Sequence, residues 1–109
     1  MSQSEDLNAV PQYLRPTYNL LSSAFPSGVP EHLYPPLLYV LYEEMSHRAL
    51  SKSVSLVSDK EYSEVYNDIP LVGGYIQGRE EPTDEFLKRV AEVKRVLDDH
   101  GYQEWLREE

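Results

Sequence analysis

The sequence predicts an all-α fold, a compact bundle of about five or six short helices in a single domain. In most segments, apolar residues recur at spacings of three and four, which is the period of an amphipathic helix. Prolines and glycines stand where these helices would begin and end. A chain of 109 residues has room for one hydrophobic core. We expect the helical domain at residues 12–109, after a flexible acidic tail at residues 1–11 that has little to bury.

The first helix is expected from about Thr17 to Ala24, where the apolar spacing is helical. The turn at residues 26–30 then has a restricted path, because its two prolines fix φ and its glycine can take positive φ. After one further helical turn, the main helix begins at Pro35, since proline is tolerated where N–H groups have no partner. We expect it to end around Met45 or Ser46.

A short helix is expected next, from about His47 to Val57, with Ser46 as its cap. Leu50 and Val54 would form its inward stripe. The segment is rich in serine, which is a poor helix former, so an alternating strand at Ser53–Val57 is the competing interpretation.

Two more short helices are predicted in the middle of the chain. Ser58 or Asp59 would cap the first, Lys60 to Tyr66. Asp68 would cap the second, Ile69 to Gln77, which has a proline in its expected first turn.

The last long helix is expected from Asp84 to about His100. Thr83 opens it, and Gly101 stands where a terminating glycine is typical. The segment Tyr102 to Arg107, which carries Trp105, is expected to form one more turn that packs back on the bundle.

Composition limits the classes of partner. The formal net charge of −9 repels nucleic acid phosphates and anionic lipid headgroups and favours a basic or apolar partner. There is no cysteine, so disulfides, thiolate nucleophiles and thiolate zinc sites are excluded. No apolar run approaches the ~20 residues of a membrane span. We therefore expect a cytoplasmic protein that does not bind membranes.

No pattern of reactive residues indicates catalysis or a cofactor. The three histidines, which could serve as bases or metal ligands, are far apart and lack ligand spacing: His32, His47 and His100. The paired or ridge-forming carboxylates are typical of exposed helix surface: Glu43–Glu44, Glu80–Glu81, and Glu61, Glu64 and Asp68. No serine stands in a nucleophile elbow. We predict no catalytic residue, no metal site and no cofactor.

The glycine-rich segment Gly73-Gly74-Tyr-Ile-Gln-Gly78 resembles a phosphate-binding loop only superficially. No Lys-Ser or Lys-Thr follows it and no strand is predicted before it. Adjacent glycines within a helix instead indicate that a neighbouring segment crosses closely or that the helix bends.

The candidate partner-binding residues lie on and after the main helix. They are three tyrosines and the two glutamates that follow them: Tyr34, Tyr39, Tyr42, Glu43 and Glu44. Aromatic side chains with polar tips are enriched at recognition surfaces. The alternative is that these tyrosines pack at the margin of the core, as they often do in a small bundle.

Several motifs together resemble a small actinobacterial family of unknown function, across residues 18–105. They are Ala24-Phe-Pro-Ser-Gly-Val-Pro, Tyr34-Pro-Pro-Leu-Leu, Asn67-Asp-Ile, Glu81-Pro-Thr-Asp-Glu with Arg89-Val90, and His100-Gly-Tyr102. The family usually has Tyr at the position of Phe25 and Trp at the position of Tyr102. The resemblance implies an all-helical domain of several short helices and implies no activity.

The function most consistent with these features is a non-catalytic protein-interaction module that binds a basic or apolar surface. One alternative is a nucleic-acid-associated regulator with a helix-turn-helix in the middle helices, although Leu50 to Ile76 contains only two basic residues, Lys52 and Lys60. The other is a metal-binding or enzymatic domain, which needs separated histidines and carboxylates to converge.

Overall fold

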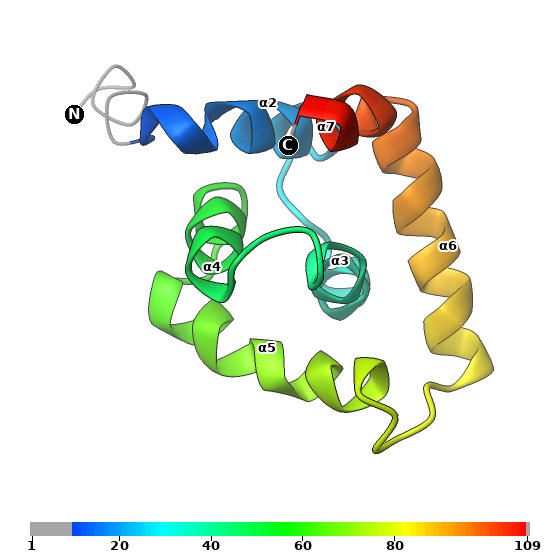
Figure 1. Cartoon of the computed structure of the whole chain (residues 1–109). Coiled ribbons are helices and arrows are strands. Elements are labelled where there is room, and N and C mark those ends of the chain that lie inside the picture. Colours follow the sequence, from blue (N-terminus) through cyan, green and yellow to red (C-terminus); the bar gives the residue numbers. More distant parts are fainter. Residues whose placement is uncertain (1–9, 109) are drawn as a thin grey trace.

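The computed structural model describes residues 10–108 and confirms the all-α fold (Figure 1). Within these residues the chain forms six α-helices and no strand. They are α2 (Arg15–Ala24), α3 (Tyr34–Leu41), α4 (His47–Leu56), α5 (Tyr62–Ile76), α6 (Asp84–Asp98) and α7 (Tyr102–Glu108), and the short 3-10 helices η1 (Gln12–Leu14) and η2 (Glu31–Leu33) precede α2 and α3. The predicted flexible tail lies outside the described residues except for Val10 and Pro11, and Val10 is buried.

Helix α3 lies at the centre of the bundle. In Figure 1 it is seen end-on, and the other helices surround it. It packs against both α5 and α6, and nearly all of its side chains are buried: Tyr34, Pro36, Leu37, Leu38, Val40 and Leu41. The predicted main helix is therefore the element around which the core is built.

Helix α3 is shorter than predicted. It ends at Leu41, short of the predicted end at Met45 or Ser46. Beyond it the N–H of Glu44 donates to the carbonyl of Leu41 at 3.0 Å, so the hydrogen bond spans three residues instead of four. This tighter bonding ends the α-helix and leaves residues 42–45, the α3–α4 turn, to connect the two helices.

Helix α4 has the predicted cap. The Ser46 Oγ accepts a hydrogen bond from the Ala49 N–H at 3.1 Å. The alternative of a strand at residues 53–57 is wrong, because the helix continues to Leu56. Serine is tolerated here because its hydroxyl can bond within the helix, as Ser51 does by donating to the His47 carbonyl at 2.7 Å.

The two helices predicted at Lys60–Tyr66 and Ile69–Gln77 are one continuous helix, α5. The predicted caps at residues 58 and 59 are also wrong, since the helix begins at a reciprocal capping box. The Glu64 carboxylate accepts from the Glu61 N–H at 3.0 Å, and the Glu61 carboxylate accepts from the Glu64 N–H. The box satisfies two N–H groups that otherwise lack partners, which fixes the helix start.

Asp68 does not cap a helix, because it lies inside α5, and Pro70 also lies within the helix. Proline removes one hydrogen bond there. Burial of Ile69 and Val72 on either side holds the helix against the core in spite of that loss. The Asp68 carboxylate instead accepts a hydrogen bond from the Tyr34 hydroxyl at 2.7 Å.

Gly73 provides the close crossing that the adjacent glycines predicted. A Cβ at this position would lie 3.1 Å from the hydroxyl oxygen of Tyr42, so a side chain here would displace that ring. Near the start of α5, Tyr62 and Tyr66 are both exposed and their rings stack on each other.

The C-terminal helices follow the prediction closely. Thr83 caps α6, since its hydroxyl oxygen accepts from the Phe86 N–H at 3.0 Å, and Gly101 has the positive φ of a helix terminator at 101°. Helix α7 packs back on α2, where the indole N–H of Trp105 donates to the Thr17 hydroxyl at 2.9 Å. This bond joins the two ends of the described chain.

The central position of α3 generates the first testable prediction. Leu38→Ala is expected to lower the free energy of unfolding by about 2–5 kcal/mol, because the side chain is 1 % exposed and its removal leaves a cavity. Leu87→Ala is the matched control, since Leu87 is 42 % exposed, and is expected to cost under about 1 kcal/mol. Urea denaturation measures both, and equal losses would contradict the assignment of the core.

Candidate functional site

Tyr34 is part of the core and does not belong to an exposed surface. It is 6 % exposed, and its hydroxyl donates to Asp68. The ammonium of Lys60 lies 4.8 Å from the centre of its ring and also pairs with Glu31 at 3.3 Å. Burial raises the pKa of Tyr34, and the hydrogen bond to Asp68 adds to the rise. Tyr34 is therefore a residue of the core, which was the alternative to a place on a binding surface.

Tyr39 is half-buried between α3, α5 and α6. Its ring packs edge-on against Phe86 with a centroid distance of 5.5 Å, and lies 6.5 Å from the ring of Tyr75. Tyr42 is half-buried elsewhere, over Gly73, and its ring centroid lies 5.1 Å from that of His47. The predicted tyrosines are therefore separated at the margin of the core and do not form one patch.

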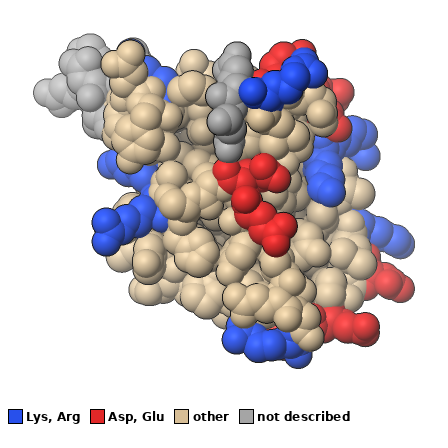
Figure 2. All heavy atoms as spheres, in the orientation of Figure 1, with Lys and Arg blue, Asp and Glu red and all other residues tan. Residues whose placement is uncertain are grey.

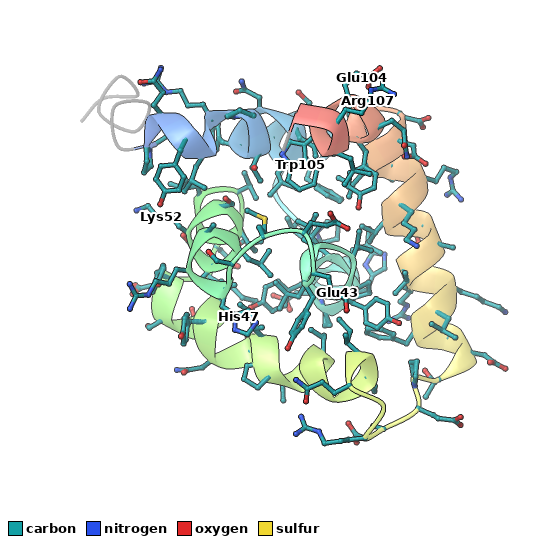
Figure 3. All side chains as sticks on the ribbon, viewed as in Figure 1. Glu43, His47, Lys52, Glu104, Trp105 and Arg107 are labelled. Atoms are coloured by element: carbon teal, nitrogen blue, oxygen red, sulfur yellow. The ribbon has the colours of Figure 1, made fainter. Side chains whose placement is uncertain are left out.

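Glu43 and Glu44 lie on the α3–α4 turn, Glu43 exposed and Glu44 half-buried. Within the described part of the chain, neither carboxylate makes an ion pair or a hydrogen bond. Figure 2 shows acidic atoms near the centre of this face, where Figure 3 places Glu43, with surface that carries no charge to their left and below them. The two carboxylates are thus an isolated negative group, here called the glutamate pair.

Two hollows flank the glutamate pair, and Glu44 lines both. The first hollow has a volume of about 320 Å³ and is lined by Tyr13, Leu14, Pro16, Thr17, Glu44, Met45, Ala49 and Trp105. The second hollow has a volume of about 360 Å³ and is lined by Tyr39, Val40, Glu43, Glu44, Tyr75, Ile76, Lys94 and Tyr102. Of the five predicted residues, the structure brings Tyr39 and the glutamate pair together and leaves the other two tyrosines apart.

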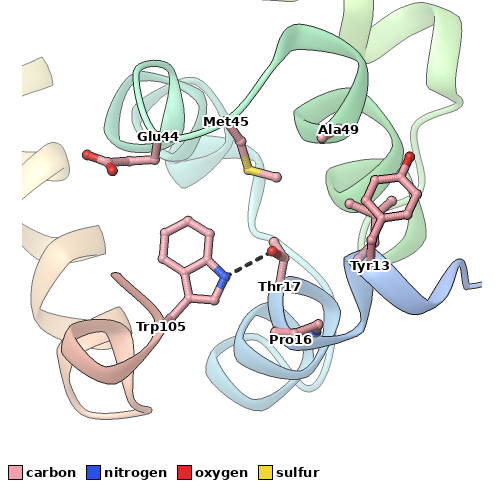
Figure 4. A pocket seen from close by; sticks show the side chains of 8 residues that line it. Tyr13, Pro16, Thr17, Glu44, Met45, Ala49 and Trp105 are labelled. Atoms are coloured by element: carbon pink, nitrogen blue, oxygen red, sulfur yellow. Dashed lines mark hydrogen bonds between the residues drawn. The ribbon is translucent and has the colours of Figure 1, made fainter. Parts of the chain in front are cut away.

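The first hollow has apolar walls and one charged edge (Figure 4). Leu14 and Trp105 are nearly inaccessible, whereas Tyr13 is 75 % exposed at one side. Met45 and Glu44 both come from the α3–α4 turn. In this view Met45 points toward Trp105 and Thr17, whereas the Glu44 carboxylate points outward from the turn. An apolar surface beside an unpaired carboxylate is suited to bind a group that is both apolar and cationic.

Sequence reasoning missed most of this hollow. Tyr13 lies before the expected first helix and was not singled out, and Met45 was assigned only to the end of the main helix. Trp105 was expected to pack back on the bundle, but the distant partner that positions it, Thr17, carries no local signal. Only the isolated tryptophan and the early tyrosine offered a hint, since both residue types are common at interfaces.

The three histidines occupy unrelated positions. His32 is exposed on η2, His47 lies between the rings of Tyr42 and Tyr66, and the Nδ1 of His100 is 2.8 Å from the Val96 carbonyl oxygen. Among residues 10–108, no group of three or more histidine or carboxylate side chains is arranged to hold a metal ion.

No protein-family model, curated protein or solved structure matches the chain. The resemblance to the actinobacterial family therefore stays a prediction. In the described part of the chain, no helix has both the length and the apolar character needed to cross a membrane.

The Trp105–Thr17 bond leads to a prediction about the wall of the first hollow. Thr17→Val keeps the shape of the side chain but leaves the buried indole N–H without an acceptor, so it is expected to cost about 1–3 kcal/mol of unfolding free energy. Thr17→Ser retains the hydroxyl and is expected to cost less. Because Trp105 is the only tryptophan, its fluorescence in a denaturant titration reports both variants. A Ser variant as unstable as the Val variant would contradict the role of the bond.

The Tyr34–Asp68 bond leads to a prediction about alkaline pH. The pKa of Tyr34 is raised above its ordinary value of 10.0, so the folded protein keeps a proton that the unfolded chain releases. The stability that this provides is complete below pH 10 and is lost as the pH rises above it. Between about pH 9 and about pH 11, the unfolding free energy is expected to fall less steeply for Tyr34→Phe than for the parent protein. Equal slopes of unfolding free energy against pH for the two proteins would show that a group other than Tyr34 causes the pH dependence.

Proposed function

We propose that this protein is a non-catalytic protein-interaction module and that its contact surface is the face around the α3–α4 turn. The observation that carries the proposal is the glutamate pair, two carboxylates without a partner among the described residues, placed between two hollows. Some other surface carboxylates, such as those of Glu31 and Glu85, are engaged with Lys60 and Arg89. What distinguishes the glutamate pair is its position between the two hollows.

The charge and composition of this face favour a basic partner with apolar side chains. The net charge of −9 attracts a cationic partner over about a Debye length of 8 Å and accelerates its encounter. Exposed ion pairs contribute little affinity by themselves, so apolar contacts are needed as well. Tryptophan, tyrosine and methionine at the first hollow are residue types enriched in protein interfaces.

The other functional hypotheses receive less support. A helix-turn-helix needs basic residues on its recognition helix, yet α5 contains no lysine or arginine. The nearest cation before it, Lys60, pairs with Glu31. The enzymatic hypothesis would need a group of ionisable residues in a hollow, and the second hollow offers only the glutamate pair and Lys94 with tyrosines. The interaction module is therefore the function that we propose.

The test uses peptides selected from a random display library for binding to the intact chain. The double variant Glu43→Lys/Glu44→Lys is expected to weaken the selected peptides about tenfold or more, because it reverses the charge at the contact surface. The matched control is Glu80→Lys/Glu81→Lys, an adjacent pair of exposed glutamates with the same change in net charge. It is expected to change affinity by about twofold at most.

Interferometry at two salt concentrations measures both variants, and circular dichroism checks that they are folded. Equal weakening by the two double variants would mean that only bulk charge matters. Unchanged binding by Glu43→Lys/Glu44→Lys would mean that the contact surface lies elsewhere. Either result would reject the proposal.

A further inference from the structure

We propose that the first hollow is a pocket for one large apolar side chain of a partner peptide, and that the adjacent residue of that peptide is an arginine or lysine paired with Glu44. This inference rests on the proposed function, because it specifies the partner at the same face. It goes beyond the proposed function in two respects: it places binding in one of the two hollows, and it specifies that the apolar and the basic residue of the partner are adjacent.

The interior of the first hollow is suited to an apolar group. Its volume of about 320 Å³ lies at the small end of the range for ligand pockets, enough for a side chain and too small for a folded element. The indole N–H of Trp105 already donates to the Thr17 hydroxyl, so it is not available to hydrogen-bond a polar ligand. In the described part of the chain, the one buried side-chain polar atom without a partner is the Ser53 hydroxyl, and Ser53 does not line this hollow.

The edge of the hollow supplies a negative charge that complements a basic residue of the partner. Glu44 is half-buried there and has no ion-pair partner among the described residues. Adjacent Cα atoms are about 3.8 Å apart, so an apolar side chain in the hollow leaves the next residue within reach of the rim. Arginine matches a carboxylate with two parallel hydrogen bonds, which makes it the better of the two cations.

The walls can adapt to an inserted side chain at low cost. Met45 is unbranched and fills irregular gaps. Tyr13 is 75 % exposed and has two side-chain torsions, so fixing it over a bound group costs little conformational entropy. Trp105 is held by Thr17 and is 5 % exposed, so it contributes a rigid aromatic edge to the wall of the hollow.

The other hollow is the weaker candidate for this role. It is lined by Lys94 as well as by the glutamate pair, so a cation on the partner would meet a like charge nearby. A second copy of the chain is also disfavoured as occupant, because each copy carries a net charge of −9. Charge complementarity thus favours a basic peptide in the first hollow.

The test is a titration of the intact 15N-labelled chain with three capped hexapeptides of glycine and serine that differ in the central pair of residues. The pairs are Phe-Arg, Phe-Glu and Ser-Arg. The Phe-Arg peptide is expected to bind with a dissociation constant of about 1 mM and to shift the Trp105 indole resonance most strongly. The other two are expected to bind at least about fivefold more weakly, since each lacks one of the two contacts.

Three variants separate binding in the pocket from general electrostatic attraction. Glu44→Gln is expected to weaken the Phe-Arg peptide about threefold, the loss of one exposed ion pair. Glu80→Gln removes the same charge from an exposed residue outside the contact surface, and is expected to leave binding nearly unchanged. Ala49→Leu, which adds volume at the wall, is expected to prevent binding.

Any of four results would overturn the inference: no shift at about 5 mM peptide, shifts centred on the second hollow or elsewhere, equal binding of Phe-Arg and Phe-Glu, or equal effects of Glu44→Gln and Glu80→Gln. If the peptides selected from the display library depend on the glutamate pair while Phe-Arg fails, the proposed function stands and this inference alone falls. If the library peptides also ignore the glutamate pair, both fail.

Discussion

The structure depends on the burial of one short helix on almost all sides. Helix α3 has only eight residues, and an isolated helix of that length is not stable in water. Its stability comes from apolar side chains such as Leu37, Leu38 and Leu41, which are almost completely removed from solvent by the surrounding helices. Every other helix of the described chain is placed so that it covers α3 or braces a helix that does.

This central burial determines where a binding face can form. The chain leaves the buried helix at Leu41 and must turn sharply to reach α4, so the α3–α4 turn emerges at the end of the core. Tyr42 packs down over Gly73, while Glu43 and Glu44 are left toward solvent. On one side of the turn, the hydrogen bond from Trp105 to Thr17 joins α7 to α2 and completes the first hollow.

The fold class and most helix positions could be predicted because they depend on local signals. Ser46, Thr83 and Gly101 act at helix ends through bonds and torsions within a few residues. The predictions of helix bounds were wrong where contacts between residues distant in sequence determine the structure. Considered by their neighbours in sequence alone, Asp68 and Pro70 indicate the start of a helix. In the structure both lie inside α5, which is held by its burial against the core and by the hydrogen bond from Tyr34 to Asp68.

The candidate site was predictable only in part, for the same reason. Glu43 and Glu44 were identified because they follow the main helix in sequence. The hollow beside them combines Tyr13, Met45 and Trp105, which come from three separate segments, and no spacing rule connects these. Tyr34 was assigned to the surface set because the bond to Asp68 spans 34 positions of the chain and leaves no local trace.

Native-state hydrogen exchange tests the central claim most directly. If α3 is the most deeply buried element, the amides of Leu38 and Leu41 exchange only through global unfolding, and their protection equals the free energy measured by denaturation. The amides of the α3–α4 turn exchange far faster. Amides of α3 that exchange more rapidly than those of α6 would contradict the account, because the bundle would then be organised around a different helix.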